Sequence, residues 1–315
     1  MNEHVPQVAD LHVHISSFNN FPTAAGLASS ASGFAALVSS LASLYKLPST
    51  PGELSLIARQ GSGSACRSLF GGFVAWNVGS KLDGTDSIAE EIAPRSHWPE
   101  MQAVICVVSD DKKGTSSTAG MQRTVDTSEL LKHRIQHIVP ARMKAIIEAI
   151  KRRDFNAFAQ VTMQDSNQFH AVALDTDPPI FYMNDISRAI VAIIVELNRA
   201  SVARGDGLVA AYTYDAGPNA VIYTLERNTK LILNLLASYF PSAADNFLDP
   251  FGLFKDGMSA GSLNLPEGFN PAVAKVYESG GVKGFIHTRV GDGPRVLGEK
   301  ESLLGSDGFP LPNLT

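Results

Sequence analysis

Residues 19–33 are the first stretch of the sequence with the composition of a ligand-binding loop. They read Asn-Asn-Phe-Pro-Thr-Ala-Ala-Gly-Leu-Ala-Ser-Ser-Ala-Ser-Gly, and apolar residues at helical spacing follow from Phe34 onward. Small residues let backbone N–H groups approach a ligand closely, and a helix N-terminus adds unpaired donors and the positive end of the helix dipole. The stretch therefore suggests a phosphate-binding loop, to which Ser29 and Ser30 add hydroxyl groups. A tight, serine-capped loop beside a sheet is the structural alternative.

A second segment rich in glycine and serine, residues 61–72, carries a single cation, Arg67. An arginine among small residues has no competing side chain, so its planar fork can hold a carboxylate or a phosphate through two parallel hydrogen bonds. Ser62, Ser64 and Ser68 place hydroxyl groups around it. The alternative is a flexible turn with a surface arginine.

Three further polar residues stand in contexts that suit binding or catalysis. Lys112 lies in a polar loop, residues 110–117, where it can reach a nucleotide phosphate or stay in solvent. His170 has the chemistry of an acid–base group, although a buried, hydrogen-bonded histidine is the more common case. Asp215 begins an Asp-Ala-Gly-Pro-Asn turn between two apolar runs. That pattern is a hairpin signal, in which aspartate is usually a turn former.

The elements that must position these residues follow from hydrophobic periodicity. Apolar runs predict strands at residues 11–15, 73–78, 103–109 and 282–290, and a hairpin over residues 209–225. Helical spacing predicts helices at residues 30–47, 128–160 (interrupted by Pro140), 187–200 and 229–240, and a Thr50-Pro51-Gly52-Glu53 capping box predicts another from residue 51. From residue 103 onward the order is strand, helices, hairpin, helix, strand. This order predicts an α+β fold with a split βαββαβ antiparallel sheet and helices on one face.

The composition limits the classes of partner. The chain has 315 residues, a hydrophobic content of 44% and a net charge of −5. A large core can therefore form, and nonspecific binding to nucleic acid or to an anionic membrane is not expected. No apolar run reaches the length of a membrane span. The two cysteines, Cys66 and Cys106, lack the spacing of a zinc site, which favours a reducing, cytoplasmic location.

Four long motifs together resemble one known family. They are residues 19–33, Gly-Ser-Gly-Ser-Ala-Cys-Arg-Ser-Leu from Gly61, Met-Gln-Asp-Ser-Asn-Gln-Phe-His-Ala from Met163, and Tyr-Asp-Ala-Gly-Pro-Asn-Ala from Tyr214. In this order they resemble mevalonate diphosphate decarboxylase, of the superfamily of galactokinase, homoserine kinase, mevalonate kinase and phosphomevalonate kinase (GHMP). The resemblance extends over essentially the whole chain. It implies a two-lobed GHMP-kinase-like fold, with an incomplete ATP- and phosphate-binding lobe at residues 1–100 and a C-terminal lobe at residues 101–315.

The resemblance also implies a reaction and a role for each motif. ATP and mevalonate 5-diphosphate would give isopentenyl diphosphate, carbon dioxide, ADP and phosphate, with Mg²⁺ held mainly by phosphates, in a homodimer. Asp215 would be the base beside the substrate's tertiary hydroxyl, and Arg67 would hold the substrate's carboxylate. The other substrate-binding residues would be Ser62, Gly63, Ser64, Ser166 and Asn167. The ATP phosphates would contact Pro22, Thr23, Ala24, Ala25, Gly26, Leu27, Ala28, Ser29, Ser30 and Lys112.

One departure from the family's pattern keeps alternatives open. The family carries, before the position of residue 11, a Lys-Tyr-Trp-Gly-Lys-type motif that holds the substrate diphosphate, and this sequence has none. The chain is therefore expected to be an N-terminally truncated member. The alternatives to an active decarboxylase are a catalytically impaired decarboxylase fragment and a related GHMP small-molecule kinase that phosphorylates without decarboxylating.

Overall fold

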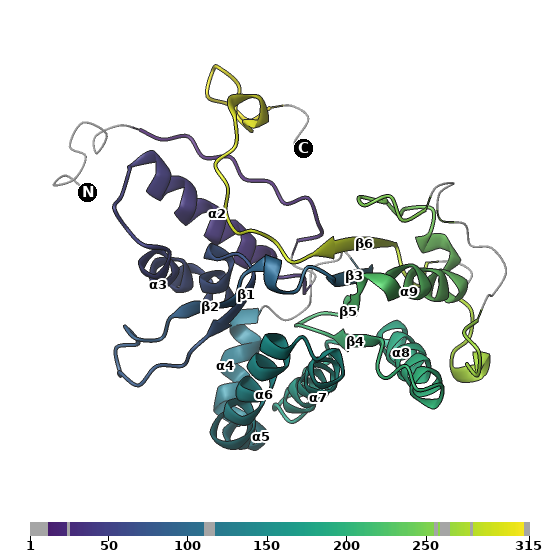
Figure 1. Ribbon diagram of the computed structural model, residues 1–315. Helices are drawn as coiled ribbons and strands as arrows, with labels where there is room; N and C mark the ends of the chain where they lie inside the picture. Colours follow the sequence, from purple (N-terminus) through teal and green to yellow (C-terminus); the bar gives the residue numbers. More distant parts are fainter. Residues whose placement is uncertain are drawn as a thin grey trace. The chain divides into compact units, whose positions relative to one another are not determined.

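The computed structural model describes residues 12–23, 26–109, 117–254, 258, 265–277 and 280–311 (Figure 1). The chain divides into two compact units, one formed by residues 1–23, 28–97 and 291–315, the other by residues 24–27 and 98–290. The sequence placed a boundary at residue 100 and the last segment in the second lobe. The structure instead groups that last segment with the first unit, where Gly72 N donates a hydrogen bond to Gly291 O (2.9 Å).

The helices of the first unit are α2 (Ser29–Leu44), α3 (Pro51–Gly61) and a 3₁₀ helix at Gly63–Leu69. The predicted capping box is confirmed, because Glu53 N donates to Thr50 Oγ1 (3.3 Å) while Thr50 N donates to Glu53 Oε2 (2.7 Å). A small core joins these helices through alanines and one leucine: Ala31, Ala35, Ala58, Ala65 and Leu69. Because α2 packs through its small side chains, the larger apolar residues predicted for its buried face, such as Phe34 and Leu44, remain exposed.

The first unit also contains a two-stranded antiparallel sheet of β1 (Phe73–Trp76) and β2 (Ala89–Ala93). The sequence predicted β1, but β2 was missed because its Ala-Glu-Glu-Ile-Ala run does not alternate. The strand predicted at residues 11–15 was wrong over residues 12–15. They have no ladder partner in the described part of the chain, and Val13 and Ile15 are exposed. Alternation alone does not make a strand when no neighbour accepts its hydrogen bonds.

The sheet of the second unit confirms the predicted βαββαβ topology. Its strands are β3 (Met101–Val107), β4 (Ala210–Thr213), β5 (Ala220–Leu225) and β6 (Gly284–Arg289). They lie in the order β4-β5-β3-β6, and every neighbouring pair is antiparallel. The β4–β5 pair is the hairpin expected around Asp215.

The helices of this unit are α4 (Ser117–Thr127), α5 (Glu129–His133), a π-helical turn (Arg134–Ile138), α6 (Val139–Arg152), α7 (Phe155–Leu174), α8 (Asp185–Ala203) and α9 (Glu226–Tyr239). Of these, α7, α8 and α9 contact the sheet. Short 3₁₀ helices occur at Arg95–His97, Pro241–Ala243, Pro271–Val273 and Glu299–Glu301. The main core joins α8 and α9 to the sheet through Ile193, Leu236, Val104 and Ile222, all fully buried. Among the described residues, no helix is both long and apolar enough to cross a bilayer.

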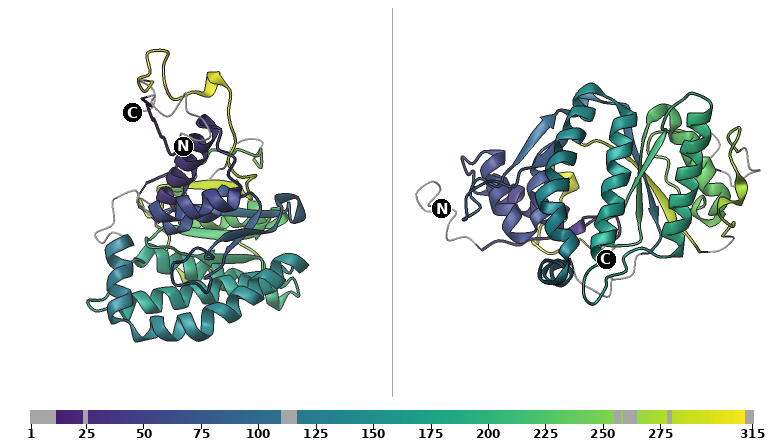
Figure 2. Two further views of the ribbon diagram at one scale, coloured as in Figure 1. Left: turned by 90° about the vertical axis from the view of Figure 1, so that its left-hand side faces the viewer. Right: turned by 90° about the horizontal axis from the view of Figure 1, so that it is seen from below.

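The region from Ser128 to Leu174 differs from the single interrupted helix that was expected. Pro140 lacks an N–H and its ring clashes with the carbonyl four residues earlier, and the wider π turn directly precedes it. Arg153 then adopts a left-handed conformation, and Asp154 caps the new helix α7. Figure 2 shows α6 and α7 side by side. The motif at residues 165–170, expected at the end of this region, lies inside α7.

Candidate active site

The start of α2 places small and hydroxyl-bearing residues from both glycine–serine motifs together. Ala28, the N-cap, is left-handed (φ 56°) and has no side chain that could cap the helix, which leaves its first-turn N–H groups to other partners. Ser30 Oγ lies 3.1 Å from Ser62 Oγ. Of the other residues expected in the loop, Pro22 is half-buried and Thr23 is exposed, whereas Ala24, Ala25 and Lys112 lie outside the described residues.

Arg67 presents its guanidinium beside a fixed aromatic ring. It lies in the 3₁₀ helix Gly63–Leu69, with Cζ 5.8 Å from the centre of the Trp76 ring. Trp76 is held by a hydrogen bond from its Nε1 to Ser87 Oγ (3.0 Å). Within the described part of the chain, Arg67 has no ion pair and its side chain donates no hydrogen bond, so its fork is available to an anion. A Cβ on Gly63 would come within 3.2 Å of the same indole, which explains a glycine there.

In the second unit, α7 brings Ser166 and Asn167 to the strand that leads to Asp215. Ser166 Oγ accepts a hydrogen bond from Tyr214 N (3.1 Å), and Asn167 Oδ1 accepts one from the Tyr212 hydroxyl (3.1 Å). Ser166 is buried, while Asp215 is exposed in the β4–β5 turn. The structure therefore places these three predicted residues around one end of β4.

Asn219, at the far end of the same turn, was missed by the sequence reasoning. Its Oδ1 accepts hydrogen bonds from Val108 N (2.6 Å) and Ser109 N (2.9 Å), and its Nδ2 donates to Ser109 O (2.9 Å). The side chain is fully buried and ties the turn of Asp215 to the end of β3. A polar residue directly before an apolar strand was the available signal, but its partners lie more than a hundred residues away.

Close packing explains why a glycine stands at position 26 of the first motif. A Cβ on Gly26 would lie 2.9 Å from both Cα and N of Gly217, in the turn that carries Asp215. Gly26 also has a φ of +76°, which favours glycine. Gly26 and Leu27 belong to the second unit, so this segment packs directly on the hairpin.

His170 lies beside the hairpin in an aromatic setting. Its ring is edge-on to Tyr182 and Tyr214, with centroids 6.2 and 6.0 Å away. Burial lowers the pKa of His170, although a backbone hydrogen bond of Tyr214 and the charge of Asp215 oppose this effect. Burial and the charge of Asp215 raise the pKa of Tyr182, against the charge of Arg123. The expected hydrogen bond is missing at one nitrogen, since His170 Nε2 is buried without a partner in the described residues.

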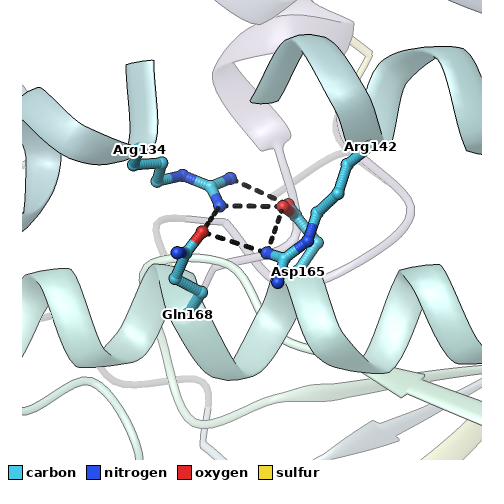
Figure 3. Close-up of polar contacts among 4 residues, drawn as sticks. All are labelled: Arg134, Arg142, Asp165 and Gln168. Carbon is cyan, nitrogen blue, oxygen red and sulfur yellow. Dashed lines mark hydrogen bonds and ion pairs between the residues drawn. The ribbon is translucent and has the colours of Figure 1, made fainter. Parts of the chain in front are cut away.

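Two arginines converge on α7 at Asp165, the residue before Ser166 (Figure 3). Arg134 binds both carboxylate oxygens (2.8 Å each), while Arg142 Nη1 donates to Asp165 Oδ1 (3.0 Å). Both arginines also donate to Gln168 Oε1, at 2.8 and 3.0 Å. Burial opposes ionisation of Asp165, but the hydrogen bonds and charges of the two arginines outweigh it and lower the pKa of its carboxyl. No local pattern in the sequence predicts this cluster.

Comparison with known proteins agrees with the motifs. Residues 103–297 match the mevalonate 5-diphosphate decarboxylase C-terminal domain, and residues 1–89 match the diphosphomevalonate decarboxylase-like N-terminal domain. A diphosphomevalonate decarboxylase from Ganoderma lucidum is 68% identical over 306 residues, which are 97% of this chain and 76% of that protein.

Solved structures of the same kind are also similar. A crystal structure of mevalonate 5-diphosphate decarboxylase aligns with a TM-score of 0.75 and 46% identity, over 93% of this chain and 73% of that one. A complex of MDDEF with MVAPP, AMPPCP and magnesium aligns with a TM-score of 0.61 and 34% identity, over 70% of this chain and 64% of that one. The chain therefore belongs to the diphosphomevalonate decarboxylase family.

Proposed function

We propose that this chain uses ATP to convert mevalonate 5-diphosphate into isopentenyl diphosphate, carbon dioxide, ADP and phosphate. The observation that carries the proposal is the 68% identity to a named diphosphomevalonate decarboxylase over nearly the whole chain. The exposed carboxylate of Asp215 and the guanidinium of Arg67, which has no ion pair within the described residues, supply the two chemical groups that such a reaction needs.

Asp215 is proposed as the general base. Its carboxylate can accept the proton of the substrate's tertiary hydroxyl while that oxygen attacks the γ-phosphorus of ATP. The new phosphate ester is a good leaving group. Its departure leaves positive character on the tertiary carbon, which draws the electron pair from the bond to the carboxylate, and carbon dioxide is released. No separate electron-sink cofactor is required.

Arg67 is proposed to orient the carboxylate that is lost. The planar guanidinium of Arg67 can bind both oxygens of a carboxylate, and its contact with the Trp76 ring helps to orient it. Strong stabilisation of the carboxylate in the ground state would slow decarboxylation, so orientation rather than tight binding is its useful contribution. Ser62 and Ser64 of the first unit and Ser166 of the second are also proposed to bind the substrate.

ATP and Mg²⁺ fit the residues present. The start of α2 has no side-chain cap at Ala28, and Ser29 and Ser30 lie in its first turn, a setting that suits phosphate. The described residues contain no group of three or more His, Cys, Asp and Glu side chains that could hold a metal. Mg²⁺ would therefore be bound mainly through the phosphates, whose charge it would neutralise during phosphoryl transfer.

The direct test is product stoichiometry. With ATP, Mg²⁺ and mevalonate 5-diphosphate, the protein is expected to release carbon dioxide and ADP in equal amounts. Release of ADP without carbon dioxide would favour the small-molecule kinase, and binding of substrate without either product would favour an impaired fragment. The homodimer and the cytoplasmic location stay predictions.

A lysine in place of Arg67 tests its proposed role. Arg67→Lys keeps the positive charge but loses the planar fork, so kcat/KM is expected to fall at least about tenfold, which corresponds to roughly 1.4 kcal/mol. Steady-state kinetics measure the change, with Arg59→Lys as a control, because Arg59 is occupied by Gly84 O (2.9 Å). An unchanged kcat/KM would mean that Arg67 does not hold the carboxylate.

A further inference from the structure

A cavity of about 340 Å³ lies in the second unit between α6, α7 and the sheet. Its volume is within the range of small-molecule sites, roughly 300–1,000 Å³. One wall is apolar and is formed by Val139, Met143, Ile146, Phe158 and Val161. The lining also has a polar end, the cluster of Arg134, Arg142 and Asp165. None of the residues proposed for the decarboxylase reaction lines it.

The polar end carries one excess positive charge, because it contains two arginines and one aspartate. Arg134 is satisfied by its two-point contact with Asp165, whereas Arg142 uses only Nη1, shared between Asp165 and Gln168 (Figure 3). Nε and Nη2 of Arg142 have no hydrogen-bond partner in the described part of the chain. The Arg142 side chain is only 22% exposed. A half-buried cation with two donors that the described residues do not use favours an anionic ligand, because charge-assisted bidentate hydrogen bonds are the strongest that a guanidinium makes.

The backbone makes this convergence possible. In a regular α-helix Arg134 and Arg142 would lie two turns and about 80° apart. The π turn Arg134–Ile138 is wider than an α-helical turn, so it reduces that rotation and brings both side chains to one carboxylate. Such turns occur often at functional sites.

We propose that this cavity binds a small carboxylate with a short hydrocarbon body. The free edge of Arg142, formed by Nε and Nη2, presents two parallel donors that match a carboxylate. The apolar wall would cover the hydrocarbon body and remove it from water. A single surplus positive charge complements a monoanion better than a diphosphate. The site is independent of the proposed catalytic function, so failure of one leaves the other intact.

The experiment is calorimetric titration of the full chain with hexanoate and with hexanamide, its neutral counterpart. Hexanoate is expected to bind saturably, with a Kd at or below about 10 mM, and hexanamide at least about tenfold more weakly. Arg142→Met should weaken hexanoate at least about tenfold. Arg152→Met is the matched control on the same helix, since Arg152 is 77% exposed and pairs with Glu148, and it should leave hexanoate binding within about twofold.

Three results would overturn the proposal: no hexanoate binding to the folded protein, equal binding of hexanoate and hexanamide, or unchanged binding in Arg142→Met. If Arg142→Met does not fold, Arg142→Lys replaces it. That variant keeps the charge without the fork, so it should bind hexanoate several-fold more weakly than the wild type. Binding by Arg142→Lys as tight as that of the wild type would then contradict the two-point contact.

Discussion

Asp215→Asn is expected to reduce turnover of mevalonate 5-diphosphate by about 10²–10⁴-fold, the usual contribution of a general base. Asparagine has nearly the same shape but cannot accept the hydroxyl proton. The turn itself should survive, because it is held by backbone and by other side chains: Gly217 N donates to Asp215 O (2.8 Å) and Asn219 anchors its end. Substrate affinity should therefore change little while kcat falls.

Single-turnover kinetics and calorimetric substrate binding would separate these two effects. Asp245→Asn is the control, because Asp245 is also an exposed aspartate of the second unit and, in the described part of the chain, has no hydrogen bond or ion pair with the site residues. Its kcat should equal that of the wild type. If Asp215→Asn also turns over at nearly the wild-type rate, Asp215 is only a turn former.

Asn219→Ala is expected to lower the free energy of unfolding of the second unit by about 2–4 kcal/mol. The substitution removes the oxygen that accepts hydrogen bonds from Val108 N and Ser109 N. Leaving the buried donor Val108 N unsatisfied costs about 1–3 kcal/mol, and loss of the partly buried hydrogen bond of Ser109 N adds about 1 kcal/mol. Urea unfolding would measure the loss, and hydrogen exchange at Val108 and Ser109 would locate it.

Asn246→Ala provides the matched control for this prediction. Asn246 makes one exposed hydrogen bond, from Nδ2 to Lys283 O (2.8 Å), so its loss should cost about 1 kcal/mol or less. Equal stability losses in the two variants would mean that Asn219 does not fasten the turn. Asn219→Ala should also reduce kcat, since the position of Asp215 depends on that turn.

The parts of the fold that the sequence predicted correctly have local signals. The capping box at Thr50 and the Asp215 turn each lie within a few consecutive residues, and the long strands and helices have clear periodicity. The parts it missed depend on contacts distant in sequence. Asn219 accepts a hydrogen bond from the end of β3, and Gly26 packs against Gly217. Arg134 binds Asp165 because of a π turn that hydrophobic periodicity does not predict.

The candidate site shows the same division. Residue types and motifs identified Arg67, Asp215 and Ser166 as candidates, because a motif shows directly which functional groups the chain carries. Their supports, Trp76 beneath the guanidinium and Tyr214 bonded to Ser166, come from other elements of the fold. A motif therefore indicates which groups react, whereas the neighbours that orient them require the three-dimensional structure.

The discontinuous first unit has a consequence for folding during synthesis. Its last contributor, residues 291–315, leaves the ribosome only after residues 98–290 of the second unit are complete. Domains tend to fold as their residues become available. The second unit can therefore fold first, whereas the first unit, with α2, α3 and the β1–β2 sheet, is complete only once residues 291–315 have followed. The order of folding would then be the reverse of the order in which the two units begin.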